Sequence, residues 1–349
     1  MKAPFVWFGG KRRVAPEVWA ALGDVPNYIE PFAGSLAVLL GRPHDMSNGT
    51  RRAETVNDAD GFLANFWRAL AHDPEAVAHW CDWPVNEVDL FARHLWLVNT
   101  GRSRLLEGME ADPDFYDAQV AGWWVWGVNA WIGSGWCSGD GPWVDTGDGI
   151  GKRPHLGNAG RGVERRLPHL GNAGRGVNRQ LPHLGDAGRA GYNNMEYRPN
   201  VLGYFEELAG RLRDVRVCCG DWSRVCTSGA MSYGSKVGVF LDPPYLGDVR
   251  TADLYAVDDH TIAHAVRDWC LEHGDDPRLR IVLAGYRAEH DDLMPDTWRR
   301  HYYSASAAYS TTESAARQDG NHANRANEVL WFSPHCVTPD RQGELWEAL

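Results

Sequence analysis

Short apolar segments that alternate with amphipathic ones constrain the fold of this chain more than any other feature of its sequence. The segments typical of strands are residues 28–32, a run ending near Val56, 215–219, 237–241, 281–284, a run around Tyr302, and 329–332. The segments typical of helices are residues 36–40 (the start of a helix), 62–70, 85–97, 201–213 and 260–273. Strands that alternate with helices predict a mostly parallel sheet covered on both faces. We therefore expect an α/β fold with a doubly wound, seven-stranded, mostly parallel sheet.

The two ends of the chain carry this alternation and the middle does not. Residues 1–74 and 201–349 are expected to form one domain, which residues 75–200 interrupt. The interruption contains six tryptophans crowded among glycines, followed within residues 154–193 by three copies of a 14-residue unit that begins PHLG-x-AGR. Glycine and proline oppose a regular helix or a long strand, so we expect an extended, loop-rich excursion there.

Composition excludes several classes of protein. With 349 residues, 44% of them hydrophobic, the chain can bury a core and is neither disordered nor fibrous. It has no apolar run of the roughly 18 residues that cross a bilayer, and its N-terminus lacks the apolar run of a signal peptide. The seven cysteines are an odd number without a CxxC pair, which favours reduced thiols over disulfides or a zinc site. We expect a soluble cytoplasmic protein.

The formal net charge of −11 is unusual for a nucleic-acid-binding protein, so its distribution matters. Residues 151–200 contain nine basic and three acidic residues, a local charge of +6, and the rest of the chain carries −17. An acidic body with one basic segment can bind a polyanion through that segment. A solvated arginine-rich loop is an equal alternative on charge alone.

The tetrapeptide Asp242-Pro243-Pro244-Tyr245 directly follows the apolar segment VGVFL. Ligands of open α/β sheets bind at the carboxyl ends of strands, which is where this sequence lies. The amino nitrogen of an aromatic base is a poor nucleophile because its lone pair is delocalised into the ring. Acceptors for its two hydrogens, here the Asp242 carboxylate and the Pro243 carbonyl, favour a pyramidal nitrogen, and the Tyr245 ring offers a face for stacking. The alternative is a proline-rich turn that only ends a strand.

A second candidate site is Glu30-Pro31-Phe32-Ala33-Gly34-Ser35, after the first strand. A glycine there allows close approach of a ligand, and a following helix N-terminus favours polar or negative groups. Asp58, 24 residues after Gly34, is placed like the acidic residue that binds a ribose. Each feature alone is more often structural, but together they indicate a nucleoside cofactor. The motifs of the usual dinucleotide and phosphate sites, G-x-G-x-x-G and G-x-x-x-x-G-K-[ST], do not occur.

These motifs, in this order, resemble the α group of DNA adenine N6-methyltransferases, the Dam-like family. The family motifs are similar to Phe5, Trp7 and Gly9-Gly10-Lys11, then Glu30–Ser35, Val56-Asn57-Asp58, Gly220-Asp221-Trp222, Asp242–Tyr245 and Asn327–Leu330. The resemblance covers roughly residues 1–70 and 215–335. Leu36 is a departure, because many members have a second glycine there, and it could tighten the cofactor turn.

The resemblance implies a Rossmann-like methyltransferase fold and S-adenosylmethionine as the cofactor. The cofactor pocket would be lined by Trp7, Lys11, Glu30, Phe32, Gly34, Asp58, Asp221, Trp222 and Asp242. The catalytic residues would be Asp242, Pro243, Pro244 and Tyr245. The methyl group would pass directly from the sulfonium to N6 of adenine, with no metal and no covalent enzyme intermediate.

In that family the target-recognition region lies between the cofactor half and the catalytic half, which here is roughly residues 75–200. Basic segments follow phosphates, and arginine can pair with bases. The candidate DNA-binding residues are Arg161, Arg165, Arg166, Arg175, Arg179 and Arg189, with Arg317 and Arg325 of the polar stretch 304–327 as further candidates. The repeated His155, His169 and His183 are expected to be polar loop residues and not metal ligands. The repeats could also be a spacer or an oligomerisation arm.

We therefore expect a site-specific DNA adenine N6-methyltransferase that acts on a base extruded from double-stranded DNA. The alternatives are methylation of RNA adenine, cytosine N4 or another planar nitrogen such as that of glutamine, and a DNA-binding protein without activity. The cytosine N4 and glutamine enzymes tend to carry Ser or Asn in place of Asp242, and a pure binder has no need of the intact tetrapeptide. The sequence leaves open the recognition sequence, a partner restriction nuclease and the oligomeric state.

Overall fold

The computed structural model describes residues 1–5, 7, 9–43, 52–131, 136–137, 143–145, 150–152, 201–244, 262–303 and 328–338. The three 14-residue repeats, Tyr245 and residues 304–327 lie outside these ranges. In the part of the chain that is described, no helix is both long enough and apolar enough to cross a membrane.

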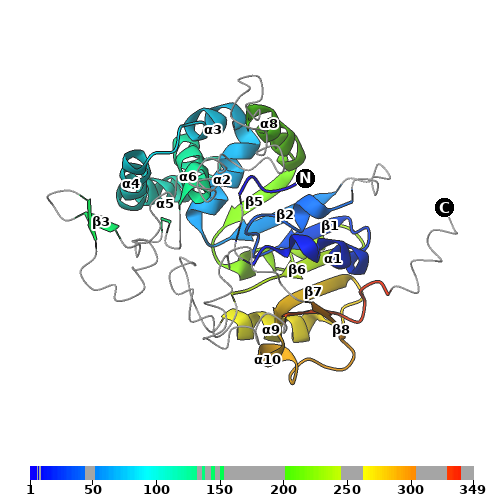
Figure 1. The fold of residues 1–349 in the computed structure, drawn as a ribbon. Coiled ribbons are helices and arrows are strands. Elements are labelled where there is room, and N and C mark those ends of the chain that lie inside the picture. The colour runs from blue at the N-terminus through cyan, green and yellow to red at the C-terminus, as the bar shows by residue number, and fades with distance from the viewer. Residues whose placement is uncertain are drawn as a thin grey trace, which may run out of the picture.

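A seven-stranded sheet forms the centre of the molecule (Figure 1). Its strands are β1 (Asn27–Glu30), β2 (Ala53–Asp58), β5 (Val215–Cys219), β6 (Val237–Leu241), β7 (Leu279–Tyr286), β8 (Arg299–Tyr303) and β9 (Glu328–Phe332). Their order is β5-β2-β1-β6-β7-β9-β8. Only β9 runs antiparallel to its two neighbours, and the other neighbouring pairs are parallel. The expected seven-stranded, mostly parallel α/β sheet is confirmed. Two short strands, β3 (Trp143–Asp145) and β4 (Ile150–Lys152), form a separate antiparallel pair.

Helices cover the sheet on both faces, and several of them gather beside its β5 edge (Figure 1). The helices are α1 (Ala15–Leu22), α2 (Gly61–His72), α3 (Pro74–Cys81), α4 (Glu87–Trp96), α5 (Arg102–Ala111), α6 (Ala118–Ala130), α8 (Val201–Leu212), α9 (Ile262–His273) and α10 (Arg287–His290). The 3-10 turns are η1 (Lys11–Arg13), η2 (Leu39–Gly41), η9 (Trp222–Val225) and η10 (Ala230–Ser232), and η4 (Leu97–Gly101) is a π-helical turn that joins α4 to α5.

The alternation of side chains along the strands produces two cores, one on each face of the sheet. In β6, Val239 and Leu241 pack into the core that α9 covers, whereas Phe240 between them packs into the core on the opposite face. All five residues of β6 are buried, as expected for a strand between two layers of helices. The continuous apolar segment in the sequence is therefore explained by burial on both faces.

The helices α3 and α6 belong to the same core as the sheet, although the sequence assigns them to the inserted region. Both helices pack on α2 and on each other, and α3 also packs on α8. The ring centroids of Phe5, Phe66 and Trp124 lie 5.3 to 5.6 Å from one another. Trp126 is also fully buried. The first part of the predicted insertion is thus continuous in its packing with the helices that cover the sheet.

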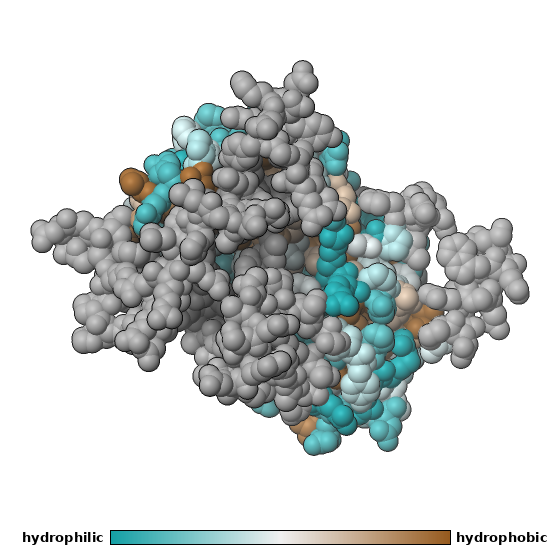
Figure 2. Space-filling view, viewed as in Figure 1, coloured by the Kyte–Doolittle hydropathy of each residue, from teal (hydrophilic) through white to brown (hydrophobic). Residues whose placement is uncertain are grey.

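Most of the expected elements are confirmed, but the helix predicted to begin at Leu36 is wrong. Leu36 has a positive φ of 54°, which an α-helix excludes, and the segment forms only the single 3-10 turn η2 before Pro43. The sequence interpretation also lacked α1, α3, α5 and α6. Where the face shown in Figure 2 displays described residues, it is mainly hydrophilic with separate hydrophobic spots.

Candidate active site

The order of the strands reverses between β1 and β6, and this is where the candidate residues meet. From β1 the chain proceeds outward through β2 to β5, and it then returns to β6 on the other side of β1. Ligands of doubly wound sheets bind at the carboxyl ends of the strands at such a switch point. Glu30 is the last residue of β1, Asp58 is the last of β2, and Asp242 directly follows β6.

A solvent-open cleft of about 830 Å³ lies at these strand ends. It is lined by Trp7, Gly9, Gly10, Lys11, Glu30, Phe32, Ala33, Gly34, Ser35, Ala37, Asp58, Ala59, Asp60, Phe240, Asp242, Pro244 and Ile262. Seven of the nine residues predicted to bind the cofactor are in this lining, and the other two are Asp221 and Trp222. The structure thus brings together side chains from segments more than 200 residues apart in the sequence.

The turn after β1 requires a glycine at its centre. Gly34 has φ +48°, and a Cβ atom there would lie 3.0 Å from two atoms of the Trp7 ring. The Gly34 carbonyl accepts a hydrogen bond of 3.0 Å from the indole nitrogen of Trp67. The absence of a side chain therefore lets Trp7 pack directly on this turn, beside the cleft.

Asp58 holds this turn through its carboxylate. Oδ2 accepts a 2.9 Å hydrogen bond from the backbone N–H of Gly34, and Oδ1 accepts one of 2.9 Å from the N–H of Asp60. Burial raises the pKa of Asp58 to about 6, although these backbone hydrogen bonds favour its ionised form. A ribose-binding role and this structural role are compatible, because a carboxylate has about four acceptor sites.

Glu30 is the most deeply buried carboxyl group on the wall of the cleft. It is 2% exposed, and its Oε2 accepts a 2.9 Å hydrogen bond from the hydroxyl of Tyr28. Burial raises the pKa of Glu30 to about 8. Among the described residues Glu30 forms no ion pair, and a cationic group beside it would favour its ionised form.

Lys11 and Asp242 form an ion pair across the cleft. The distance from Lys11 Nζ to Asp242 Oδ1 is 3.0 Å, and the same ammonium donates a 2.9 Å hydrogen bond to the Gly9 carbonyl. The lysine side chain is 5% exposed and the aspartate 19% exposed. Lys11 thereby fixes the carboxylate that the sequence analysis assigns to catalysis. Pro243 and Pro244 follow it, whereas Tyr245 lies outside the described residues.

Asp221 and Trp222 are near the cleft but do not line it. Asp221 begins η9 by accepting a 2.9 Å hydrogen bond from the N–H of Ser223. The Trp222 ring stacks on Phe32, with centroids 6.2 Å apart and planes at 27°. Phe32 lines the cleft, and Trp222 therefore packs against a residue of the cleft wall without lining the cleft itself.

Asn57 and Asp60 are two residues to which sequence analysis assigned no role. The buried Asn57 amide donates hydrogen bonds of 3.0 Å to the Pro31 carbonyl and 2.9 Å to the Gly220 carbonyl, and so joins the loops that follow β1 and β5. Asp60 lines the cleft and caps α2 by accepting from the N–H groups of Phe62 and Leu63. The cap is visible in the sequence as an Asp before an apolar helical pattern, but no local signal indicates the role of Asn57.

The predicted DNA contacts fall outside the described part of the chain, as do the three repeated histidines. The residues in question are Arg161, Arg165, Arg166, Arg175, Arg179, Arg189, Arg317, Arg325, His155, His169 and His183. Their roles stay predictions. Within the ranges that are described, no group of three or more His, Cys, Asp or Glu side chains is placed to hold a metal ion.

The sheet topology, with its ligand cleft at the switch point, is consistent with a Rossmann-like methyltransferase fold. Residues 7–85 match the model of a protein family, the D12 class N6 adenine-specific DNA methyltransferases. This match confirms the resemblance to the Dam-like enzymes and supports an enzyme of this type, which methylates adenine in DNA. No curated protein matches the chain.

Proposed function

We propose that this protein transfers a methyl group from S-adenosylmethionine to N6 of an adenine extruded from double-stranded DNA at a specific sequence. The observation that carries the proposal is the position of Asp242, at the switch point of the sheet and in one cleft with Glu30, Gly34 and Asp58. The family match supports adenine in DNA as the substrate.

The charge of the cleft fits this cofactor. Among the described residues that line it are four carboxyl groups, those of Glu30, Asp58, Asp60 and Asp242, and one ammonium group, that of Lys11. Such a site favours a cation over the phosphates of a dinucleotide or a nucleoside triphosphate. The turn at Gly34, where a Cβ would press on Trp7, also allows a ligand to approach the backbone closely.

Each part of the cleft has a role in this proposal. Bound S-adenosylmethionine supplies an activated methyl group on a sulfonium centre. Glu30 binds a positive group of the cofactor, Asp58 accepts hydrogen bonds from ribose hydroxyls, and the Trp7 ring covers the turn at Gly34. The cleft orients the cofactor towards the strand end where Asp242 lies, which reduces the entropic cost of the reaction.

At the acceptor side, the Asp242 carboxylate and the Pro243 carbonyl accept hydrogen bonds from the amino group of adenine. These acceptors favour a pyramidal nitrogen whose lone pair is available for attack, and they stabilise the positive charge that develops on it. Lys11 holds the carboxylate in place through the 3.0 Å ion pair. The amino proton leaves to solvent after transfer. The Tyr245 ring would stack on the extruded base.

The proposal is tested with labelled S-adenosylmethionine and mixed-sequence double-stranded DNA, followed by digestion to nucleosides. We expect label in N6-methyl-2′-deoxyadenosine, and a loss of at least about 100-fold in Asp242→Ala. Asp296→Ala, at a fully exposed carboxylate, is the matched control and should keep full activity. A parallel assay with RNA that gives label when DNA gives none would redirect the proposal to RNA adenine, and cofactor binding without any transfer would indicate a non-catalytic DNA-binding protein.

A further inference from the structure

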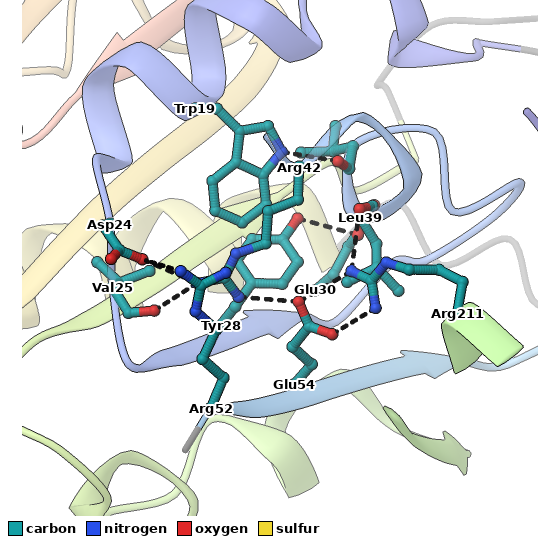
Figure 3. Close-up of polar contacts among 11 residues, drawn as sticks. Trp19, Asp24, Val25, Tyr28, Glu30, Leu39, Arg42, Arg52, Glu54 and Arg211 are labelled. Atoms are coloured by element: carbon teal, nitrogen blue, oxygen red, sulfur yellow. Dashed lines mark hydrogen bonds and ion pairs between the residues drawn. The ribbon is translucent and has the colours of Figure 1, made fainter. Parts of the chain in front are cut away.

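Tyr28 and Glu30 lie two residues apart on β1, and their side chains point to the same side of the strand (Figure 3). Both are buried, and the Tyr28 hydroxyl donates the 2.9 Å hydrogen bond to Glu30 Oε2. The Tyr28 ring is held by Trp19, with ring centroids 4.7 Å apart. A rigid, buried ring thus presents its hydroxyl group to one oxygen of the carboxyl group on the wall of the cleft.

The charged groups around this pair leave Glu30 without a counter-ion among the described residues. The nearest arginines are both bound to Glu54 on β2, Arg42 at 2.8 Å and Arg211 at 2.6 Å (Figure 3). On the cleft side, Asp242 adds a negative charge near Glu30, and Lys11 is paired with Asp242. Burial is the largest cause that raises the pKa of Glu30 to about 8, so near neutral pH the carboxyl group is mostly protonated.

We propose that Tyr28 is a positioning residue that holds the Glu30 carboxyl group in the cleft, and that Glu30 releases a proton when a cationic group of the cofactor binds to it. This inference rests on the proposed function, since S-adenosylmethionine carries two cations, a sulfonium and an ammonium group. The proton passes from the carboxyl group to solvent, no covalent bond of the ligand changes, and the carboxylate that remains pairs with the cation. Cofactor affinity then increases as the pH rises towards about 8.

The Tyr28 hydroxyl stabilises the ionised form of Glu30, and its removal therefore makes the proton harder to release. In Tyr28→Phe the ring and its packing remain, but the carboxylate loses a hydrogen-bond donor. We expect the pH midpoint of cofactor binding to move upward by about one unit and the affinity at pH 7 to fall on the order of tenfold. A residue with only a packing role would not shift this midpoint.

The experiment is calorimetric titration of the full-length protein with S-adenosylmethionine from pH 6 to 9, in buffers with different heats of ionisation. The heats give the number of protons released on binding as well as the affinity. The amino group of S-adenosylmethionine also titrates in this pH range, but it does so in the same way with every variant. The number of protons released is therefore compared between variants. The wild type should release more protons near pH 7 than Glu30→Gln, whose amide cannot ionise. Repeating the titration with S-adenosylhomocysteine, which lacks the sulfonium, shows which cation Glu30 binds.

Tyr116→Phe, at a half-buried tyrosine outside the cleft, is the matched control and should behave as the wild type. Equal proton release by the wild type and Glu30→Gln would overturn the proposal, and that comparison does not require a folded Tyr28 variant. An unchanged midpoint in Tyr28→Phe would overturn the positioning role. If one of these two outcomes occurs while the wild type still binds the cofactor and methylates DNA, the proposed function stays intact. If the wild type does not bind the cofactor at any pH, both this inference and the proposed function are overturned.

Discussion

Leu36 occupies a backbone conformation that L-residues other than Asn and Asp rarely adopt. Its φ is +54°, yet its side chain is completely buried in the core that α1 and α2 share with the sheet. A left-handed conformation costs roughly 1–2 kcal/mol in a residue with a Cβ atom. The burial of the side chain offsets this cost, which explains how a leucine is tolerated in a turn with a left-handed backbone conformation.

Leu36→Gly is expected to destabilise the protein, because the lost burial exceeds the relieved strain. Truncation of a buried leucine to alanine costs about 2–5 kcal/mol. Leu36→Ala keeps the strain and loses the side chain, so it should be about 1 kcal/mol less stable than Leu36→Gly. Urea unfolding followed by tryptophan fluorescence measures both. A glycine variant as stable as the wild type would show that the buried side chain contributes little.

Lys11→Met is expected to reduce the rate of methyl transfer on the order of 10- to 100-fold at saturating cofactor, because Asp242 loses the partner that fixes it. Arg12→Met, on the next and exposed residue of η1, is the matched control. Steady-state kinetics at saturating cofactor give the comparison. Equal rates in the two variants would mean that the ion pair does not position Asp242 for catalysis.

The sequence predicted the chemistry of individual residues better than their contacts. Glu30, Asp58 and Asp242 lie at strand ends in one cleft, as their motifs indicate. That Asp58 bonds to the Gly34 N–H, or that Asn57 joins two loops, depends on which strand ends are neighbours in space. The strand order, and not the local sequence, decides these contacts.

Among the elements, α8 is joined to strand β2 of the sheet by one cluster of charges (Figure 3). Arg211 of α8 binds both carboxylate oxygens of Glu54 on β2, at 2.6 and 2.9 Å, and Arg42 binds the same carboxylate at 2.8 Å. Arg42 in turn donates to the Val25 carbonyl and stacks over the Trp19 ring. The cluster fixes the first helix after the inserted region to the cofactor half.

Arg211→Met is expected to cost about 2–4 kcal/mol of unfolding free energy at pH 7, because it removes a two-point interaction with a mostly buried carboxylate. The two arginines hold the pKa of Glu54 below its usual value. The stabilisation from the ionised Glu54 is present above pH 4.5, and it is lost as the pH falls through the lower pKa that Glu54 has in the folded state. The free-energy cost of Arg211→Met should therefore be smaller in acid. Urea unfolding at pH 7 and pH 4 tests both statements.

Arg213→Met is the control for this measurement, since Arg213 is exposed two residues further along the chain. It should change stability by less than about 0.5 kcal/mol. If Arg211→Met lowers the free energy of unfolding by the same amount at pH 7 and at pH 4, the result would contradict the stabilising ion pair between Arg211 and the ionised Glu54.

Element types followed from the sequence wherever periodicity was strong. The five residues of β5 and of β6 are those predicted, because both strands are short, apolar and bounded by polar residues. The helix predicted at residues 36–40 is wrong, because Leu36 has a positive φ and the segment forms a turn. It also lacked α6, because three tryptophans and two glycines within that helix obscure its period although its N-cap Asp117 is a standard signal.

For the whole molecule, two buried carboxyl groups make the cleft a source of instability at alkaline pH. Burial raises the pKa of Glu30 to about 8 and that of Asp58 to about 6. A carboxyl group whose pKa is raised by folding stabilises the folded state at pH values below its ordinary pKa. This stabilisation is lost as the pH rises through the pKa that the group has in the folded protein. Between pH 5 and 8.5 the free protein should therefore become less stable.

Glu30→Gln is expected to remove the larger part of this dependence. Relative to the wild type, the variant should gain thermal stability steadily as the pH rises from about 5 to 8.5, since its amide carries no charge to bury. Thermal unfolding across this range, without cofactor, gives the difference curve. Melting curves that stay parallel over the whole range would contradict the raised pKa of Glu30.

Charge is divided between two parts of the predicted insertion. Residues 74–131 contain nine acidic and three basic residues, a net of −6, whereas residues 151–200 carry +6. By charge alone, residues 74–131 are therefore poorly suited to contact phosphate, whereas residues 151–200 have the sign of charge that attracts a polyanion. The overall α/β class was predictable from the sequence, but the continuity of α3 and α6 with the main core was not, because packing partners distant in sequence leave no local pattern.

The helices on either side of residues 132–200, α6 and α8, both pack on α2 and α3. The segment between them therefore leaves from and returns to the same group of helices. The 14-residue unit is encoded by whole codons, and its gain or loss keeps the reading frame. Copy number can thus differ between genes by whole repeats, each of which adds or removes 14 residues between two helices that share the same packing partners.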